Sequence, residues 1–155
     1  MNKPELSIII PCYNCSETLT EAVESCFAQG LNNFEIIMVD DGSTDLTRDV
    51  MKELAEKHVE IKLYYHEINK GGGATRNTAV ENSSADIIFC LDSDDILPKN
   101  VLPKMVIKMK EKNCDGVLFE ETRFFSATNI EVTENIKNTI IERSISFEDM
   151  FKNVG

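Results

Sequence analysis

Apolar residues along the chain fall into short uninterrupted runs and longer stretches with a helical repeat. Residues 6–10, 34–39 and 87–91 are almost entirely aliphatic or aromatic, which is typical of strands buried on both faces of a sheet. Residues 61–65 alternate more between apolar and polar, so we expect that strand nearer an edge. A further strand is predicted at 117–119.

Between these runs, apolar residues recur three and four positions apart, the spacing of one helix face. This pattern predicts helices near 19–27, 46–54 and 101–109, with weaker patterns at 74–82 and 146–151. Ser16 stands where it could cap the first helix and Gly30 where it could end it. Strands alternating with amphipathic helices predict an α/β fold, with a mostly parallel sheet covered by helices on both faces.

The chain's 155 residues are enough for one domain with a substantial core. We see no repeat and no linker, so a single domain over 1–155 is expected. The pattern weakens after about residue 126, and the chain stops at Gly155 as though cut from something longer.

Charge and cysteine content narrow the class of protein. With 16 basic and 27 acidic residues the formal charge is −11, which argues against a nucleic-acid clamp or a binder of anionic membranes. No apolar run approaches the roughly 18 residues of a transmembrane segment. The 5 cysteines are irregularly spaced, which fits reduced thiols better than a disulfide framework. We therefore expect a soluble, acidic, cytoplasmic domain.

Unusual polar residues follow three of the predicted strands, with the sequences PCYN at 11–14, DD at 40–41 and DSDD at 92–95. Ligands of open parallel sheets bind beyond the carboxyl ends of the strands. If these strands are neighbours, several carboxylates converge there, and oxygen ligands suit a hard ion such as Mg²⁺ or Mn²⁺. The alternative is that these aspartates only end strands and cap helices.

Other motifs leave more than one interpretation open. Three glycines at 71–73 could let backbone approach a phosphate or could only form a turn. Arg76 could pair with a diphosphate or with a surface carboxylate, and it stands where a dinucleotide motif needs its last glycine. Cys12 and Cys15 form a CxxC pair, which raises a redox function, although structural thiols are the commoner outcome. The two histidines are not spaced from these cysteines as the ligands of a zinc site are.

Four segments together resemble the N-terminal, donor-binding part of a family 2 glycosyltransferase with the Rossmann-like GT-A fold. They are SIIIPCYN (7–14), IIMVDDGSTD (36–45), NKGGGATRN (69–77) and ADIIFCLDSDDILP (85–98). They occur in the family's order and spacing and cover about residues 5–120. The resemblance implies a UDP-sugar donor and a divalent metal, Mn²⁺ or Mg²⁺.

The resemblance also implies roles for individual residues. Pro11 and Tyr13 would line the base pocket, and Asp41 would accept a hydrogen bond from the base N3–H, which uracil has and cytosine lacks. Asp40 would hold the turn or contact ribose, and Arg76 would lie near the diphosphate.

The segment DSD matches the family's DxD motif. Asp94 would be the direct metal ligand, and Asp92 would lie nearer the ribose or the waters on the metal. Both residues are therefore predicted at the metal.

The implied reaction is an inverting transfer to an acceptor hydroxyl on a glycan, lipid-linked sugar or polysaccharide. We expect the catalytic base and the acceptor site beyond residue 155, because Glu148 and Asp149 follow Asp94 too soon. The chain alone is then expected to be inactive, and its relatives often work at the cytoplasmic membrane face. The alternatives are a catalytically incomplete nucleotide-binding module, a CxxC redox domain or a receiver-type signalling domain, the last disfavoured because the first strand ends in PCYN.

Overall fold

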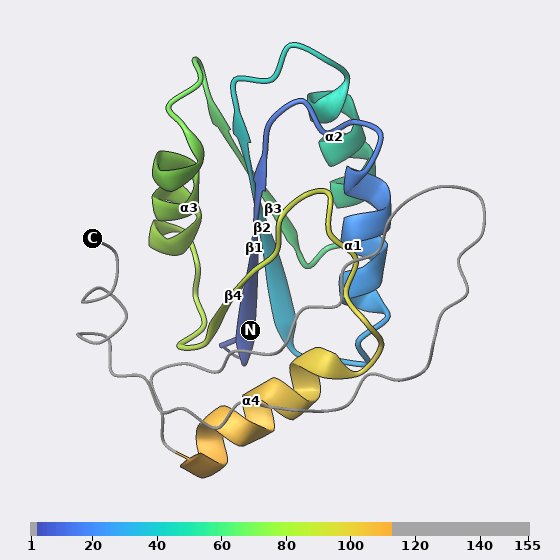
Figure 1. Ribbon diagram of the computed structural model, residues 1–155, viewed down its shortest axis with the longest axis vertical. Coiled ribbons are helices and arrows are strands. Elements are labelled where there is room, and N and C mark those ends of the chain that lie inside the picture. The colour runs from blue at the N-terminus through green and yellow to red at the C-terminus, as the bar shows by residue number, and fades with distance from the viewer. Residues whose placement is uncertain (1–2, 113–155) are drawn as a thin grey trace, which may run out of the picture. The chain divides into compact units, whose positions relative to one another are not determined.

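The computed structural model describes residues 3–112, in which strands and helices alternate (Figure 1). The elements are β1 (Leu6–Cys12), α1 (Leu19–Phe27), β2 (Phe34–Asp41), α2 (Thr47–Lys57), β3 (Ile61–His66), α3 (Gly72–Glu81), β4 (Ile88–Cys90) and α4 (Val101–Lys112). Met1–Val106 form one compact unit, to which the description below applies. The predicted strand at 117–119, the predicted helix at 146–151 and the pair Glu148 and Asp149 lie outside the described residues.

The four described strands form one parallel sheet in the order β3-β2-β1-β4. Figure 1 shows α3 on one face of this sheet and α1 and α2 on the other. The predicted α/β class, the parallel sheet and its cover on both faces are therefore confirmed. The alternating strand β3 lies at an edge of the described sheet, as its pattern predicts.

Two clusters of apolar side chains explain why the central strands lack a polar face. The larger cluster joins β1 and β2 to α1, α2 and α4. The smaller joins Ile9, Ile37 and Val39 to Ala79 of α3. Burial on both sides removes the usual polar positions of a strand, which is why β1 and β2 read as continuous apolar runs. Among the described helices, none combines the length and the apolar character needed to cross a bilayer.

The boundaries differ from the predicted ones where polar residues take part in regular structure. β2 continues through Asp40 and Asp41, because the parallel ladder pairs backbone groups whatever the side chain. Helix α3 begins at Gly72, two residues before the predicted start. The prediction that Ser16 caps α1 is wrong: the N-cap position is Thr18, and the Ser16 N–H donates to Asp45 instead.

The segment between the DSD sequence and α4 is held by polar side chains of α1 and its C-terminal turn. The fully buried Gln29 donates from Nε2 to the carbonyl oxygens of Ser25 (3.0 Å) and Pro98 (2.9 Å). Its Oε1 accepts from the N–H groups of Val101 (2.9 Å) and Leu102 (3.1 Å), the first residues of α4. One side chain thus caps the N-terminus of α4 from a distant part of the chain.

Replacing Gln29 by leucine should therefore destabilise the protein. The substitution puts an apolar side chain of similar size in place of the amide and leaves buried N–H and carbonyl groups without partners, at a cost of about 2–4 kcal/mol. Urea denaturation measures the free energy of unfolding. Thr20→Leu, at an exposed position of α1, should change it by less than about 0.5 kcal/mol. Equal stability of the two variants would contradict the capping role.

Candidate functional site

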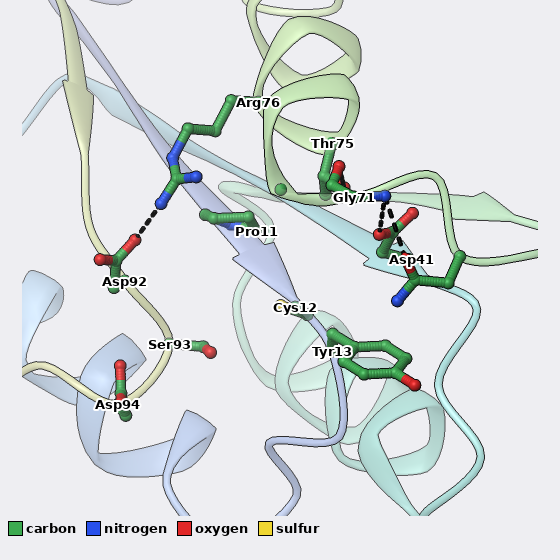
Figure 2. A pocket seen from close by; sticks show the side chains of 12 residues that line it. Pro11, Cys12, Tyr13, Asp41, Gly71, Thr75, Arg76, Asp92, Ser93 and Asp94 are labelled. Atoms are coloured by element: carbon green, nitrogen blue, oxygen red, sulfur yellow. Dashed lines mark hydrogen bonds and ion pairs between the residues drawn. The ribbon is translucent and has the colours of Figure 1, made fainter.

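A pocket of about 270 Å³ opens at the carboxyl ends of β1 and β2, beside the first turn of α3 and the segment after β4 (Figure 2). Its lining is Pro11, Cys12, Tyr13, Asp41, Asn69, Gly71, Gly72, Thr75, Arg76, Asp92, Ser93 and Asp94. Figure 2 shows Tyr13 and Asp41 toward one end and Arg76 and Asp92 toward the other. β1 lies between β2 and β4, so the three polar strand ends are neighbours, which is the condition for their carboxylates to converge.

Asp41 is buried and connects β2 to the loop before α3. Its Oδ1 accepts from His66 Nδ1 (2.7 Å) and from the Lys70 N–H (2.9 Å), and its Oδ2 accepts from the Gly71 N–H (2.8 Å). Burial raises the pKa of Asp41, but these donors outweigh it and hold the pKa below its usual range. The carboxylate therefore stays ionised and acts only as an acceptor.

Asp40 lies behind the pocket and is not part of its lining. Its fully buried carboxylate accepts from the N–H groups of Gly42 (3.2 Å) and Ser43 (3.2 Å) and from Arg48 Nε (2.6 Å). Of its two predicted roles, the structure places it in the turn and not at the pocket where ribose would bind.

Gly42 allows two loops to meet at this turn. It has φ +73°, and a Cβ added there would lie 2.8 Å from backbone atoms of Ile68 and Asn69. Only glycine fits this close approach. The β2–α2 turn is therefore packed backbone to backbone against the loop that carries Asn69 into the pocket.

The loop after β1 is bonded to the loop after β2. Asn14, at φ 49°, donates its N–H to Ser43 Oγ (3.0 Å) and accepts the Thr44 N–H at Oδ1 (2.8 Å). The Cys15 N–H donates to Thr47 Oγ1 (2.8 Å). These bonds fix the backbone on the C-terminal side of Tyr13, whose side chain is 49% exposed and lines the pocket.

Arg76 is paired within the pocket. Its Nη2 lies 2.5 Å from Asp92 Oδ1, and its Nε donates to Cys90 Sγ at 3.3 Å. The contact with Cys90, followed by that with Asp92, raises the pKa of Arg76 above its usual value. A Cβ at Gly72 would lie 3.0 Å from Nη1, so glycine at the start of α3 leaves room for the guanidinium.

Asp92 and Asp94 are exposed and line the pocket together. Within residues 3–112 no group of three or more histidine, cysteine, aspartate or glutamate side chains is arranged to hold a metal. Their carboxylate oxygens still fit Mg²⁺ or Mn²⁺, which bind one or two carboxylates and take further ligands from phosphate or water.

The CxxC pair lies against the wall of the pocket. Cys12 is 1% and Cys15 9% exposed, and neither forms a disulfide. A hydrogen bond from Cys12, with smaller contributions from Ser93 and Thr47, lowers the pKa of Cys15 to about 6 despite its burial. A redox centre needs an accessible thiolate, so the burial of both sulfurs favours a structural role.

Sequence reasoning did not identify His66, Asn69 and Thr75. Asn69 and Thr75 line the pocket, and His66 bonds to Asp41 from behind it. The available signal for His66 is its position at the end of a strand, opposite Asp41 in the β2–β3 register. That register is not readable from one sequence, because both strands could slide without breaking their patterns.

The sequence profile described as Glycosyl transferase family 2 matches residues 7–153. A glucosyltransferase of Escherichia coli, WfgD, named for transfer from UDP-Glc to α-D-GlcNAc-diphosphoundecaprenol, is 31% identical over 97% of this chain and 56% of its own length. An uncharacterised glycosyltransferase of Haemophilus influenzae is 38% identical over 68% of this chain and 42% of its own length. The chain thus spans about half the length of these relatives.

Solved structures are also similar to the structure of this chain. Staphylococcus aureus TarS in complex with UDP-GlcNAc has a TM-score of 0.71 and 29% identity, covering 81% of this chain and 36% of TarS. The mannosyltransferase PcManGT of Pyrobaculum calidifontis, in complex with GDP-Man and Mn²⁺, has a TM-score of 0.59 and 25% identity over 64% of this chain and 30% of its own.

Replacing Asp41 by asparagine should destabilise the protein in a pH-dependent way. The folded pKa lies below the unfolded value of about 3.9, so ionised Asp41 stabilises the fold fully at neutral pH, and this stabilisation is lost as the pH falls below about 4. At pH 7 we expect Asp41→Asn to cost about 2 kcal/mol, since an amide cannot accept from all three donors.

Urea denaturation of both proteins between pH 7 and pH 3 measures this difference. The gap in the free energy of unfolding should narrow below about pH 4. A gap that stays constant or widens in that range would contradict the ionised, hydrogen-bonded carboxylate.

Proposed function

Since this chain belongs to glycosyl transferase family 2, we propose that its pocket binds a UDP-sugar with a divalent metal, for transfer of the sugar with inversion to an acceptor hydroxyl. One observation carries the proposal. The pocket has an acceptor-only carboxylate, Asp41, at one end, and an arginine beside two carboxylates, Asp92 and Asp94, toward the other. A nucleoside diphosphate has complementary chemistry at its two ends.

The base would bind at the Asp41 end. An ionised carboxylate accepts from the N3–H of uracil and repels the unprotonated N3 of cytosine. Pro11 and Tyr13 would flank the ring, since both line this pocket and half of the Tyr13 side chain is exposed. The UDP and UDP-GlcNAc complexes of TarS support a uridine nucleotide.

The diphosphate would bind at the Arg76 end, where its charge needs a cation. The pocket lining has three carboxylates and one guanidinium, so an added diphosphate would be repelled without further positive charge. Asp94 would hold the divalent ion directly, and Asp92 would lie next to it while paired with Arg76. Such an ion stabilises the charge that develops on the leaving diphosphate. The Mn²⁺ in the PcManGT complex supports this assignment.

A carboxylate base must remove the proton of the acceptor hydroxyl. Asp41 accepts hydrogen bonds from the loop before α3, and Asp92 is paired with Arg76. Asp94 is assigned to the metal. We therefore assign the base to a residue outside the pocket lining. The acceptor would be a glycan, polysaccharide or lipid-linked sugar, and the diphosphoundecaprenol in the name of WfgD supports the last.

Titration calorimetry with UDP tests the donor site. We expect UDP to bind in the presence of Mn²⁺ and at least about tenfold more weakly in chelator, because the metal offsets the charge of the phosphates. Asp94→Asn should lose a similar factor in Mn²⁺.

Asp49→Asn is the matched control, since Asp49 pairs with Lys52 on α2 and does not line the pocket. Its affinity for UDP should equal that of the wild type. UDP affinity that is the same with and without metal, or no affinity in folded protein, would overturn the proposed donor site.

Arg76 should contribute to phosphate binding and not to base binding. Arg76→Gln removes the charged fork, so we expect about a tenfold loss of UDP affinity and less than about a twofold change for uridine. Arg76→Lys keeps the positive charge but not the two parallel N–H donors of the guanidinium, so its UDP affinity should lie between those of the wild type and Arg76→Gln. Competition binding with both ligands measures this, and equal losses for UDP and uridine would contradict the assignment.

A further inference from the structure

We propose that His66, held in place by Thr78, is a positioning residue that orients the Asp41 carboxylate and thereby sets which nucleobase the pocket accepts. The inference rests on the proposed function, because it concerns the base end of the same pocket. It assigns a role to two side chains that contact no pocket ligand themselves.

His66 joins three elements through its two ring nitrogens. It is the last residue of β3, is 5% exposed, and lies opposite Asp41 in the parallel register with β2. Its Nδ1 lies 2.7 Å from Asp41 Oδ1, and its Nε2 lies 3.0 Å from Thr78 Oγ1 on α3. The imidazole therefore has a polar partner at both nitrogens.

The chemistry of these partners fixes where the ring carries its proton. The ionised Asp41 can only accept, so the hydrogen on Nδ1 must point to it. In the neutral ring, Nε2 is then an acceptor, and the Thr78 hydroxyl donates to it. Asp41 thus selects the tautomer, and the bond to Thr78 holds the ring in the orientation that presents this donor to Asp41.

Counting lone pairs shows what this donor does for the pocket. Asp41 Oδ1 accepts from His66 and from the Lys70 N–H, which fills its two lone pairs. Oδ2 accepts the Gly71 N–H. The Thr75 hydroxyl also lies close enough to lower the pKa of Asp41, but its one hydrogen is donated to the Gly71 carbonyl oxygen at 2.9 Å, so Oδ2 of this pocket-lining residue keeps a lone pair for a ligand. With Oδ1 held by His66 and Lys70 and Oδ2 held by Gly71, the orientation of the carboxylate is fixed, and its remaining acceptor has one direction.

Selectivity follows from that fixed direction. A base with an N–H at the ring position facing Oδ2, as in uracil, completes the carboxylate's hydrogen bonds, whereas cytosine places a lone pair against it. If His66 is removed, Oδ1 has an unfilled lone pair and keeps only the Lys70 N–H, so the carboxylate is held less tightly in this orientation. The bond to uracil then weakens, and the penalty against cytosine weakens with it.

The experiment compares UDP and CDP binding by titration calorimetry in Mn²⁺. Relative to the wild type, His66→Leu should lose about tenfold in UDP affinity with less than about a twofold change for CDP, so the preference for UDP falls about tenfold. His66→Asn, whose side-chain N–H₂ can replace the Nδ1 donor, should recover most of the preference. Thr78→Val should lose part of it, and Thr78→Ser should keep it.

His58→Leu is the matched control, since His58 is the other histidine of the chain and stacks on Phe27 with ring centroids 3.9 Å apart, away from the pocket lining. Its affinities should equal those of the wild type. Thermal melting of each variant identifies those that are folded. If His66→Leu does not fold, Thr78→Val decides the question, because it leaves His66 and all backbone contacts of Asp41 in place.

The outcomes separate the two proposals. A wild type without affinity for UDP overturns the proposed function and this inference together. A wild type that prefers UDP, with His66→Leu and Thr78→Val losing UDP and CDP affinity by the same factor, leaves the function standing and overturns the inference. Loss of the preference with rescue by His66→Asn supports it, because a purely structural role would not depend on the base.

Discussion

A single buried carboxylate, that of Asp41, connects the parts of this fold that form the pocket. It ends β2, accepts from the end of β3 through His66, and accepts from the backbone of Lys70 and Gly71 just before α3. Because α3 starts at the next residue, these bonds also set where Arg76 lies. The Asp41 end and the Arg76 end of the pocket thus depend on the same group.

The segment with Asp92 and Asp94 forms the other side of the pocket and is held by different residues. The segment that carries Asp92 and Asp94 follows β4, and its continuation is held by α1 through Gln29 and through Ser25, whose Oγ accepts the Leu97 N–H at 3.0 Å. Both aspartates therefore stay exposed on a short segment with anchored ends. This arrangement leaves their carboxylates open to the pocket without exposing the core beneath them.

Much of this organisation was predictable, for a physical reason. In a parallel sheet covered on both faces, strands must be apolar throughout, and polar residues after them must gather at one edge. This is why PCYN, Asp41 and the DSD segment could be placed together from the sequence alone. The order and spacing of the four segments also predicted the family, and this prediction is confirmed.

The features that could not be predicted depend on contacts between residues distant in sequence. Asp40 and Asp41 are adjacent and identical in type, yet one faces the Gly42 turn and Arg48 while the other faces the pocket. Only the alternation of side chains along β2, combined with its register to β3, distinguishes them.

Helix α3 gave a weak signal because it packs through Thr75 and Ala79, small residues that allow close approach but form no apolar stripe. Ser16 does not cap α1 because the chain first makes a turn, in which the N–H groups of Thr18 and Leu19 donate to the Cys15 carbonyl oxygen, and the helix begins only at Leu19. Neither case can be read from the spacing of apolar residues.

The electrostatics of the pocket make the proposed function internally consistent. A chain of net charge −11 with three carboxylates in one pocket repels a free diphosphate. Arg76 offsets only part of that charge, since it is already paired with Asp92. An anion can bind there only if it brings a cation, so donor and metal would enter as a coupled pair. Under the proposed function, the same acidity that argues against nucleic acid would select a metal-bound nucleotide over free phosphates.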